Sequence, residues 1–320
     1  MDLQLEQLES VTLADVLRES VSIPRSSPRT FALITLTLVF PLSFAVLAHT
    51  LFTHPIFRHL HASSSSSSGE WALLLLYQFI YLLFLFTFSL LSTAAVVFAV
   101  ASLYAAKPVS FRSTLSAIRP ILPRLLRTFL WVALIMLLYN LAFAFSILLL
   151  LVATHSVDSP SFLLGLALVL LAFLAAHVYI SAIWHLASVV SVLEPICGLA
   201  AMTKSRDLLR GRARMAAAFV ATYLGFCGLI GWAFRAIVVK GPDEDGSAGA
   251  GTGTKVLIGG ALVAVLVVLN LVGLLVQSVF YYVCKSYHHQ QIDKSVLYDH
   301  LGGYLGEYVP LKSSIQMENF

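Results

Sequence analysis

The residues of this sequence that could do chemistry within a membrane are the polar side chains inside its six longest apolar segments. A charge at the centre of a bilayer costs at least about 2.5 kcal/mol, so Asp, Glu, Lys or Arg there usually serves a function. None of the six segments contains Asp, Glu or Lys, and Arg235 is the one charged residue within them. The strongly polar neutral positions include Gln78, Asn140, His177, His185, Asn270 and Gln277.

Four positions are the candidate functional residues within the membrane: Asn140, Asn270, Gln277 and Arg235. Asn270 and Gln277 are seven residues apart, so they share one face of a helix. There they could line a polar path or hydrogen-bond neighbouring helices, and we favour hydrogen bonding. Arg235 lies near the end of its segment, where we expect it to reach the lipid headgroups rather than a substrate.

Metal and enzyme chemistry have little support. His177 and His185 lie eight residues apart on one segment without further ligands, so we expect neutral, packed histidines. Cys284, His288 and His289 form a Cys/His cluster, but no second ligand pair follows it. The sequence also contains no GxSxG, HExxH, P-loop or dinucleotide motif. We therefore expect no metal, no cofactor and no enzymatic activity.

The apolar segments that must position these residues predict an all-α, polytopic membrane protein. Of the 320 residues, 59% are hydrophobic and 11% are charged, against about 45–50% and about 25% in soluble domains. A helix needs about 20 apolar residues to cross a bilayer core of about 30 Å. The predicted membrane domain is 30–283, between an N-terminal segment, 1–29, and a C-terminal tail, 284–320. Its spans are 30–52, 71–103, 128–153, 161–193, 215–239 and 256–283.

The positive charges predict that both ends of the chain are cytosolic, since Lys and Arg are retained on that side during insertion. Three basic residues precede the first span, five follow the second, five follow the fourth and three lie in the tail, which makes 16 of the 20. The opposite side has three. The candidate residues for binding cytosolic lipid headgroups are Lys107, Arg112, Arg119, Arg124, Arg127, Lys204, Arg206, Arg210, Arg212 and Arg214.

Each pair of spans follows a short basic segment, which predicts three tandem hairpins introduced by short cytosolic or interfacial amphipathic helices. In the first segment Leu13, Val16, Leu17 and Val21 form an apolar stripe, and Thr12 with Asp15 has capping-box spacing. The second has Phe111, Leu115, Ile118 and Leu122 on one face, and Pro120 and Pro123 are expected to limit its helix. The third runs from Pro195 to a stop at Gly211. These helices either lie in the membrane interface or pack on the bundle.

Glycines at spacings of three residues predict close helix packing in the last two spans. Gly225, Gly228 and Gly231 repeat along the fifth span, and Gly259 with Gly260 lies on the sixth. Small residues let helix backbones approach closely within a membrane.

Two resemblances add to this architecture. The segment LEPICGLAAMTKSRDLLRGR at 193–212 resembles a motif of prokaryotic six-pass proteins, including the membrane domain attached to some glycerophosphodiester phosphodiesterases. Over its whole length the chain is similar to an uncharacterised family of plant multi-pass membrane proteins. That similarity is carried by ESVSIP at 19–24, FPLSFAVLAH at 40–49, SYHHQ at 286–290 and LGGYLGEYVPL at 301–311. Both resemblances imply architecture, and the phosphodiesterase catalytic domain is absent from this sequence.

Two classes of function fit the sequence. We favour a non-enzymatic protein that organises or traffics within the endomembrane system, with its basic segments binding anionic lipid headgroups or cytosolic protein partners. The alternative is a facilitative transporter or channel for a small or lipid-like solute. We expect no nucleic-acid partner, because the basic residues have no stacking aromatics arranged around them. The host membrane (endoplasmic reticulum, another endomembrane or plasma membrane) and the oligomeric state stay open.

Overall fold

The computed structural model describes residues 12–62, 68–107, 110–154, 159–239 and 252–290, and the chain is all-α over these ranges. Residues 1–11 of the N-terminal segment, parts of the connections after the first and fifth spans, and residues 291–320 of the C-terminal tail lie outside them. The helices, in order, are α1 (Leu13–Ser26), α2 (Pro28–Ile34), α3 (Phe40–Ala62), α4 (Ser68–Tyr104), α5 (Phe111–Thr154), α6 (Pro160–Leu193), α7 (Leu199–Leu208), α8 (Ala213–Phe234) and α9 (Thr252–Tyr287). A π-helical turn at Thr35–Val39 joins α2 to α3, and another at Arg235–Val239 follows α8.

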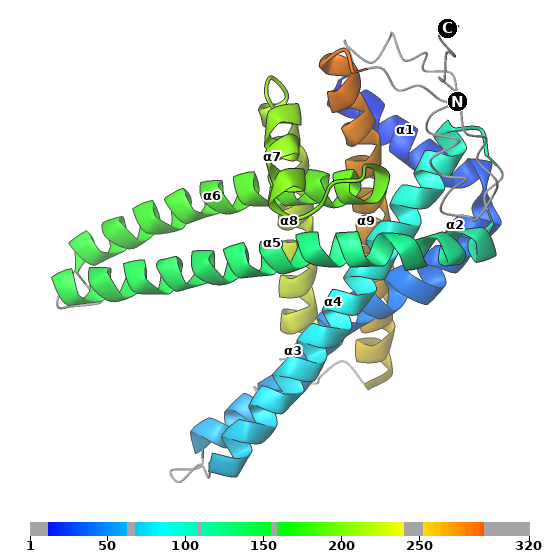
Figure 1. Cartoon of the computed structure of the whole chain (residues 1–320). Helices are drawn as coiled ribbons and strands as arrows, with labels where there is room; N and C mark the ends of the chain where they lie inside the picture. Colours follow the sequence, from blue (N-terminus) through cyan, green and yellow to red (C-terminus); the bar gives the residue numbers. More distant parts are fainter. Residues whose placement is uncertain (1–11, 63–67, 108–109, 155–158, 240–251, 291–320) are drawn as a thin grey trace, which may run out of the picture.

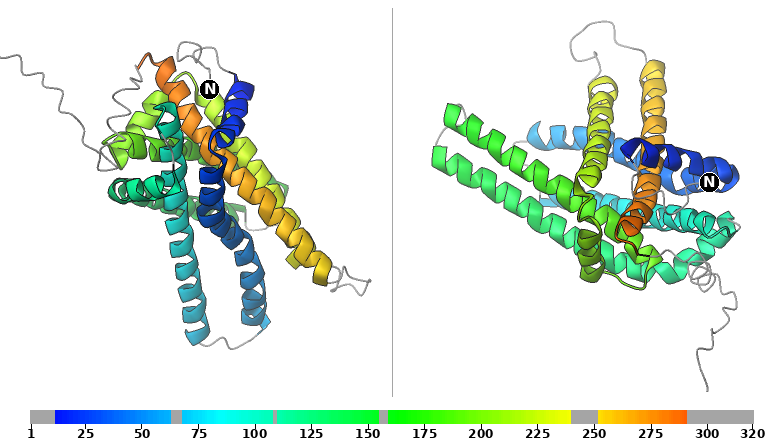
Figure 2. Two further views of the ribbon diagram at one scale, coloured as in Figure 1. Left: turned by 90° about the vertical axis from the view of Figure 1, so that its right-hand side faces the viewer. Right: turned by 90° about the horizontal axis from the view of Figure 1, so that it is seen from above.

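Six of the described stretches are long and apolar enough to cross a membrane, which confirms the predicted fold class. They are Pro28–Phe52, Trp71–Tyr104, Phe111–Thr154, Pro160–Leu193, Ala213–Val239 and Gly253–Tyr287. They pair in chain order as three antiparallel hairpins, α3 with α4, α5 with α6 and α8 with α9 (Figure 1). The three hairpins diverge from a common centre, and the α5–α6 hairpin runs across the direction of α8 and α9 (Figures 1 and 2).

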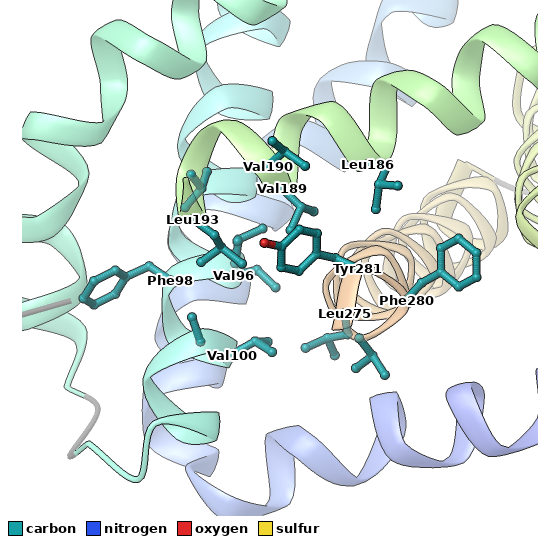
Figure 3. Close-up of a cluster of buried hydrophobic side chains, with 14 of the residues drawn as sticks. Val96, Phe98, Val100, Leu186, Val189, Val190, Leu193, Leu275, Phe280 and Tyr281 are labelled. Carbon is teal, nitrogen blue, oxygen red and sulfur yellow. The ribbon is translucent and has the colours of Figure 1, made fainter. Parts of the chain in front are cut away.

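One helix from each hairpin contributes to the buried centre, which we call the crossing region. It consists of Ser92–Ser102 of α4, Leu186–Leu193 of α6 and Leu275–Cys284 of α9, and each of these runs is buried continuously. Figure 3 shows Val96, Val190 and Tyr281 from the three helices gathered there. All three runs lie toward the C-terminal ends of their helices, so the core forms at the ends predicted to be cytosolic. The small residues of α4 allow this crowding, because they let several helices approach one backbone.

The far halves of the hairpins carry apolar side chains that no described helix covers. Leu73 and Leu75 of α4, and Leu164 and Leu171 of α6, are each more than half exposed. In water this much apolar surface would be strongly unfavourable, whereas in a bilayer it faces acyl chains. The exposed surface therefore agrees with a membrane location for these segments.

Helix α1 packs on the bundle and leaves part of its apolar stripe exposed. The predicted capping box between Thr12 and Asp15 begins the helix. Val16, with Ser20 and Ile23, is buried, and α1 lies against α9. In contrast Leu17 is 41% exposed, as are Leu13 and Val21 to similar extents. The first amphipathic segment therefore packs on the bundle, and a position in the membrane interface stays a prediction.

The second basic segment is the beginning of a span and not a separate helix. The expectation that Pro120 and Pro123 limit a short helix is wrong, because α5 continues unbroken through both prolines. A proline inside a helix costs about 3 kcal/mol through its missing N–H and its ring. On either side of the prolines Ala117, Ile121 and Leu125 are fully buried, and this packing holds the helix together.

The predicted close packing at the fifth-span glycines is also wrong for this chain. A side chain added at Gly225, Gly228 or Gly231 would meet no described atom within 4 Å. Of the glycines named for the last two spans, Gly259 faces α8, because a Cβ there would lie 3.6 Å from the ring of Phe234. The face of α8 that carries the three glycines points away from the packed helices.

Candidate functional site

A cavity of about 520 Å³ lies among α6, α8 and α9, and residues of α1, α3, α4 and α5 complete its wall. Its volume is within the range of about 300–1,000 Å³ typical of sites for small ligands. Most lining residues are aliphatic or aromatic, such as Phe219, Phe226 and Leu269. The polar lining residues are Ser89, Ser92 and Thr93 of α4, His177, Ser181, His185 and Ser188 of α6, Thr222 and Tyr223 of α8, and Asn270 and Gln277 of α9.

A histidine–glutamine pair lines this cavity between two hairpins. His185 Nδ1 lies 2.9 Å from Oε1 of Gln277, which joins α6 to α9. The Gln277 side chain is 8% exposed. The imidazole also stacks on Trp184, with 5.0 Å between the ring centroids. The pair is therefore held from both sides, and sequence reasoning had named Gln277 but had treated His185 as an ordinary packed histidine.

Asn270 joins three helices at another part of the cavity wall. Its amide nitrogen donates to Ser43 Oγ of α3 at 2.8 Å, and its Oδ1 accepts from the Tyr223 hydroxyl of α8 at 2.7 Å. Both polar groups of the amide thus have protein partners. The arrangement fits hydrogen bonding between helices better than contact with a solute.

The other two candidate intramembrane residues lie away from this cavity. Asn140 is exposed on α5 and donates to the carbonyl of Met136 on its own helix at 2.7 Å. Arg235 is exposed at the beginning of the π-helical turn after α8. The structure therefore brings Asn270 and Gln277 to one cavity and leaves Asn140 and Arg235 outside it.

Directly beyond the C-terminal end of α6, Glu194 lies at the centre of an ion-pair cluster. Its Oε1 accepts a 2.6 Å hydrogen bond from the Tyr281 hydroxyl and lies 3.2 Å from Lys285 Nζ. Its Oε2 accepts from Lys204 Nζ of α7. Burial alone would raise the pKa of Glu194, but the hydrogen bonds from Lys204 and Tyr281 and the charge of Lys285 lower it below its ordinary value. The carboxylate therefore joins α6, α7 and α9 in its charged form.

Sequence reasoning missed Glu194 as a site residue, although a usable signal was present. The residue is the first acid after a span, it is followed by Pro195, and it belongs to the segment resembling prokaryotic six-pass proteins. An isolated acid beside two distant lysines cannot be matched to them without the fold.

A turn fixed by a glycine connects Glu194 to α7. The Gly198 N–H donates to Thr128 Oγ1 at 2.8 Å, and Thr128 Oγ1 is also 2.7 Å from Ser191 Oγ. Gly198 has φ +65° and ψ −137°, a combination that essentially only glycine adopts. This turn ties the end of α6 to α5 next to the ion-pair cluster.

The basic residues predicted to bind headgroups divide by exposure. Arg112, Arg119, Arg127, Arg206, Arg210 and Arg214 are exposed. Lys107 is 5% exposed, and its backbone N–H donates to the Ser102 carbonyl at 2.9 Å in the turn that ends α4. Arg124 is half-buried and donates to the backbone carbonyl of Glu194 at 3.4 Å, and Arg212 lies over the Tyr287 ring at 4.8 Å from its centroid.

Within the described ranges no group of three or more His, Cys, Asp or Glu side chains could hold a metal ion. His288 Nε2 instead lies 3.1 Å from the carbonyl oxygen of Leu208.

A family model described as a domain of unknown function, DUF8558, matches residues 1–320. The chain belongs to the DUF8558 family. No curated protein and no solved structure matches the chain. The cavity and the Glu194 cluster thus belong to one DUF8558 domain that extends over the whole sequence.

Proposed function

We propose that this multi-pass membrane protein is a non-enzymatic carrier that binds a lipid-like solute within its bundle and facilitates its movement. The observation that carries the proposal is the cavity among α6, α8 and α9, which combines apolar walls with a few neutral polar groups. Such a lining suits a molecule with a hydrocarbon body and a small polar group. Of the two classes that the sequence favours, the solute carrier gains this support.

The chemistry of the lining favours facilitated movement over ion-coupled transport. The residues that line the cavity include His177 and His185 but no Asp, Glu, Lys or Arg. Proton- and ion-coupled transporters carry the coupling charge on Asp, Glu, Lys or His side chains, and the two histidines here have no acidic partner in the lining. We propose accordingly that the solute moves down its own gradient.

The membrane and orientation that we propose follow from the sequence. The distribution of basic residues supports cytosolic N- and C-termini. The similarity to a plant multi-pass family is the basis for proposing a plant-type protein, and we propose an endomembrane such as the endoplasmic reticulum as its location.

A second candidate function is organisation or trafficking at the cytosolic face. It is favoured by the exposed arginines at the end of α5 predicted to be cytosolic and around α7, and by the exposed apolar residues of α1. Basic residues near the membrane attract anionic lipids with about 1 kcal/mol each. If this candidate is correct, proteoliposomes of the full chain should capture anionic vesicles, and reversing Arg112, Arg119 and Arg127 to Glu should abolish the capture.

Reconstitution of the purified protein into vesicles tests the carrier proposal through the flux of fluorescent lipid analogues. We expect Gln277→Leu to lower the flux strongly, because it removes a polar group of the cavity wall. Asn140→Leu is the matched control, since Asn140 is exposed on α5 and lies away from the cavity. Flux equal to that of empty vesicles, or flux unchanged by Gln277→Leu, would contradict the proposal.

A further inference from the structure

The proposed function leaves the chemical class of the solute open, and the cavity restricts it. We propose that the solute is an uncharged lipid with a hydroxyl headgroup, such as a sterol, a diacylglycerol or a long-chain alcohol, and that His185, oriented by Gln277, binds the hydroxyl. The assignment rests on the proposed function, because it names the ligand of the same cavity.

The electrostatics of the cavity favour an uncharged headgroup. Every polar group that lines the cavity belongs to a Ser, Thr, Tyr, Trp, His, Asn or Gln side chain. A phosphate or ammonium headgroup would lose its hydration there without meeting an opposite charge, and a buried unpaired charge is strongly unfavourable. The nearest basic side chain along α9, Lys285, is already paired with Glu194 at 3.2 Å. The cavity therefore disfavours phospholipids and favours neutral headgroups.

The His185–Gln277 contact fixes the role of the second imidazole nitrogen. Because Gln277 Oε1 can only accept, His185 Nδ1 carries the proton of their 2.9 Å contact. His185 Nε2 is then an acceptor without another partner among the described residues. The reverse orientation of the amide would make Nε2 a donor, from which a hydroxyl oxygen can also accept.

A hydroxyl group matches this acceptor, because its proton can be donated to His185 Nε2. An ester or phosphate oxygen can only accept, and a quaternary ammonium group can do neither. The Gln277 amide contacts the opposite side of the imidazole ring and fixes which nitrogen accepts. An unsatisfied buried polar group costs about 1–3 kcal/mol, so this contact distinguishes hydroxyl lipids from analogues that lack the proton.

An apolar wall lies next to the pair. Trp184 stacks on the imidazole, the Tyr223 ring meets it edge-on at 6.3 Å between centroids, and Phe219 and Phe280 extend the surface along α8 and α9. Leu13 and Leu17 of α1 also line the cavity. The polar pair thus lies within a largely hydrocarbon-lined space, which is the arrangement that an amphiphile with one small polar group requires.

Photolabelling of the purified full chain tests the assignment. The probes are a sterol and a diacylglycerol, each with a photoreactive group in its hydrocarbon part, and a phosphatidylcholine with the same photoreactive chain. We expect the two hydroxyl lipids to label peptides of α6, α8 or α9. We further expect unlabelled sterol to compete, and its methyl ether to compete about 5- to 100-fold less well, since the ether lacks the donor proton.

Variants supply an independent arm with a matched control. Gln277→Leu should reduce labelling by the hydroxyl lipids about 5- to 100-fold. Gln78→Leu should leave it unchanged, because Gln78 makes a comparable 2.9 Å contact with His49 between α3 and α4, outside the cavity. The ether competition uses the unaltered protein, so it decides the question even if a variant fails to fold.

The outcomes separate this assignment from the carrier proposal. If phosphatidylcholine labels the same peptides as well as the hydroxyl lipids do, or if the methyl ether competes equally, the headgroup assignment is wrong and the carrier proposal stands. If none of the three lipids labels the helices that line the cavity, both are wrong.

Discussion

The hydroxyl of Tyr281 on α9 donates a 2.6 Å hydrogen bond to Glu194 at the end of α6. Through this contact, the centre of the last hairpin is tied to the end of the middle hairpin. The neighbouring hydroxyl of Tyr282 is buried, and it has no hydrogen-bond partner within the described ranges. Two adjacent tyrosines therefore differ in what their hydroxyl groups contribute.

Removing these two hydroxyl groups should have opposite consequences for stability. We expect Tyr281→Phe to lower the free energy of unfolding by about 1.5–3 kcal/mol, because it removes a hydrogen bond to a charged group. Tyr282→Phe should leave stability unchanged or raise it, since it removes a buried hydroxyl without a described partner. Melting temperatures of the two variants in the same detergent measure the difference. Equal losses in both variants would contradict the role of Glu194 as the acceptor.

The ion-pair cluster should make stability depend on pH through Glu194. Since its pKa in the folded protein is below the ordinary value of 4.5, the unfolded chain binds a proton more readily than the folded one as the pH falls. The stability from Glu194 is therefore fully present above about pH 4.5 and is lost as the pH falls through the lowered pKa. We expect Glu194→Gln to melt at a lower temperature than the unaltered protein near pH 7, and the gap to narrow toward pH 3. A gap that is the same at both pH values would show that the carboxylate charge is unimportant.

Two glycines with different surroundings provide a test of the turn after α6. Gly198→Ala should destabilise the protein by about 1–3 kcal/mol, because alanine is strained at φ +65°, and its Cβ would also lie 3.1 Å from the Trp131 ring. Gly225→Ala is the control, since it lies within α8 with no described atom near its added Cβ. Its effect should be neutral or stabilising by up to about 1 kcal/mol. Thermal melting compares the two, and a harmless Gly198→Ala would exclude strain at this turn.

Orientation in the membrane can be read from glycosylation, because the natural sequence contains no Asn-x-Ser/Thr acceptor. We expect a cassette carrying one acceptor to be glycosylated when inserted within 240–251, and to stay unmodified when inserted between Lys107 and Ser110. A gel shift after expression in cells with an endoplasmic reticulum reports the result. The reverse pattern would place both termini on the opposite side.

The sequence predicted the apolar segments well and the contacts between them poorly. Long apolar runs have one structural solution in a bilayer, so the six spans and their pairing were readable from composition and spacing. Pro120 and Pro123 misled because local propensity was outweighed by burial of α5 on its neighbours. The prediction from the glycines of α8 was wrong because small residues permit close packing of helices but do not place another helix against them.

The candidate site was predictable only in part, for a related reason. Asn270 and Gln277 could be selected from their polarity within an apolar span, yet their partners His185 and Tyr223 lie on other helices. The separation of 92 residues between His185 and Gln277 leaves no spacing that a single sequence could reveal. Glu194 is similar, because its lysines come from α7 and α9.

The position of α9 in the crossing region has a consequence for biosynthesis. This helix leaves the ribosome after the other five spans, yet it lies against α1, α3, α4, α6 and α8. The earlier spans therefore insert into the bilayer first. The central faces of α4 and α6 stay uncovered until α9 inserts between them. A chain that stops before residue 275 lacks the segment that completes the core, so we expect truncated chains to be recognised by quality control as unassembled and degraded.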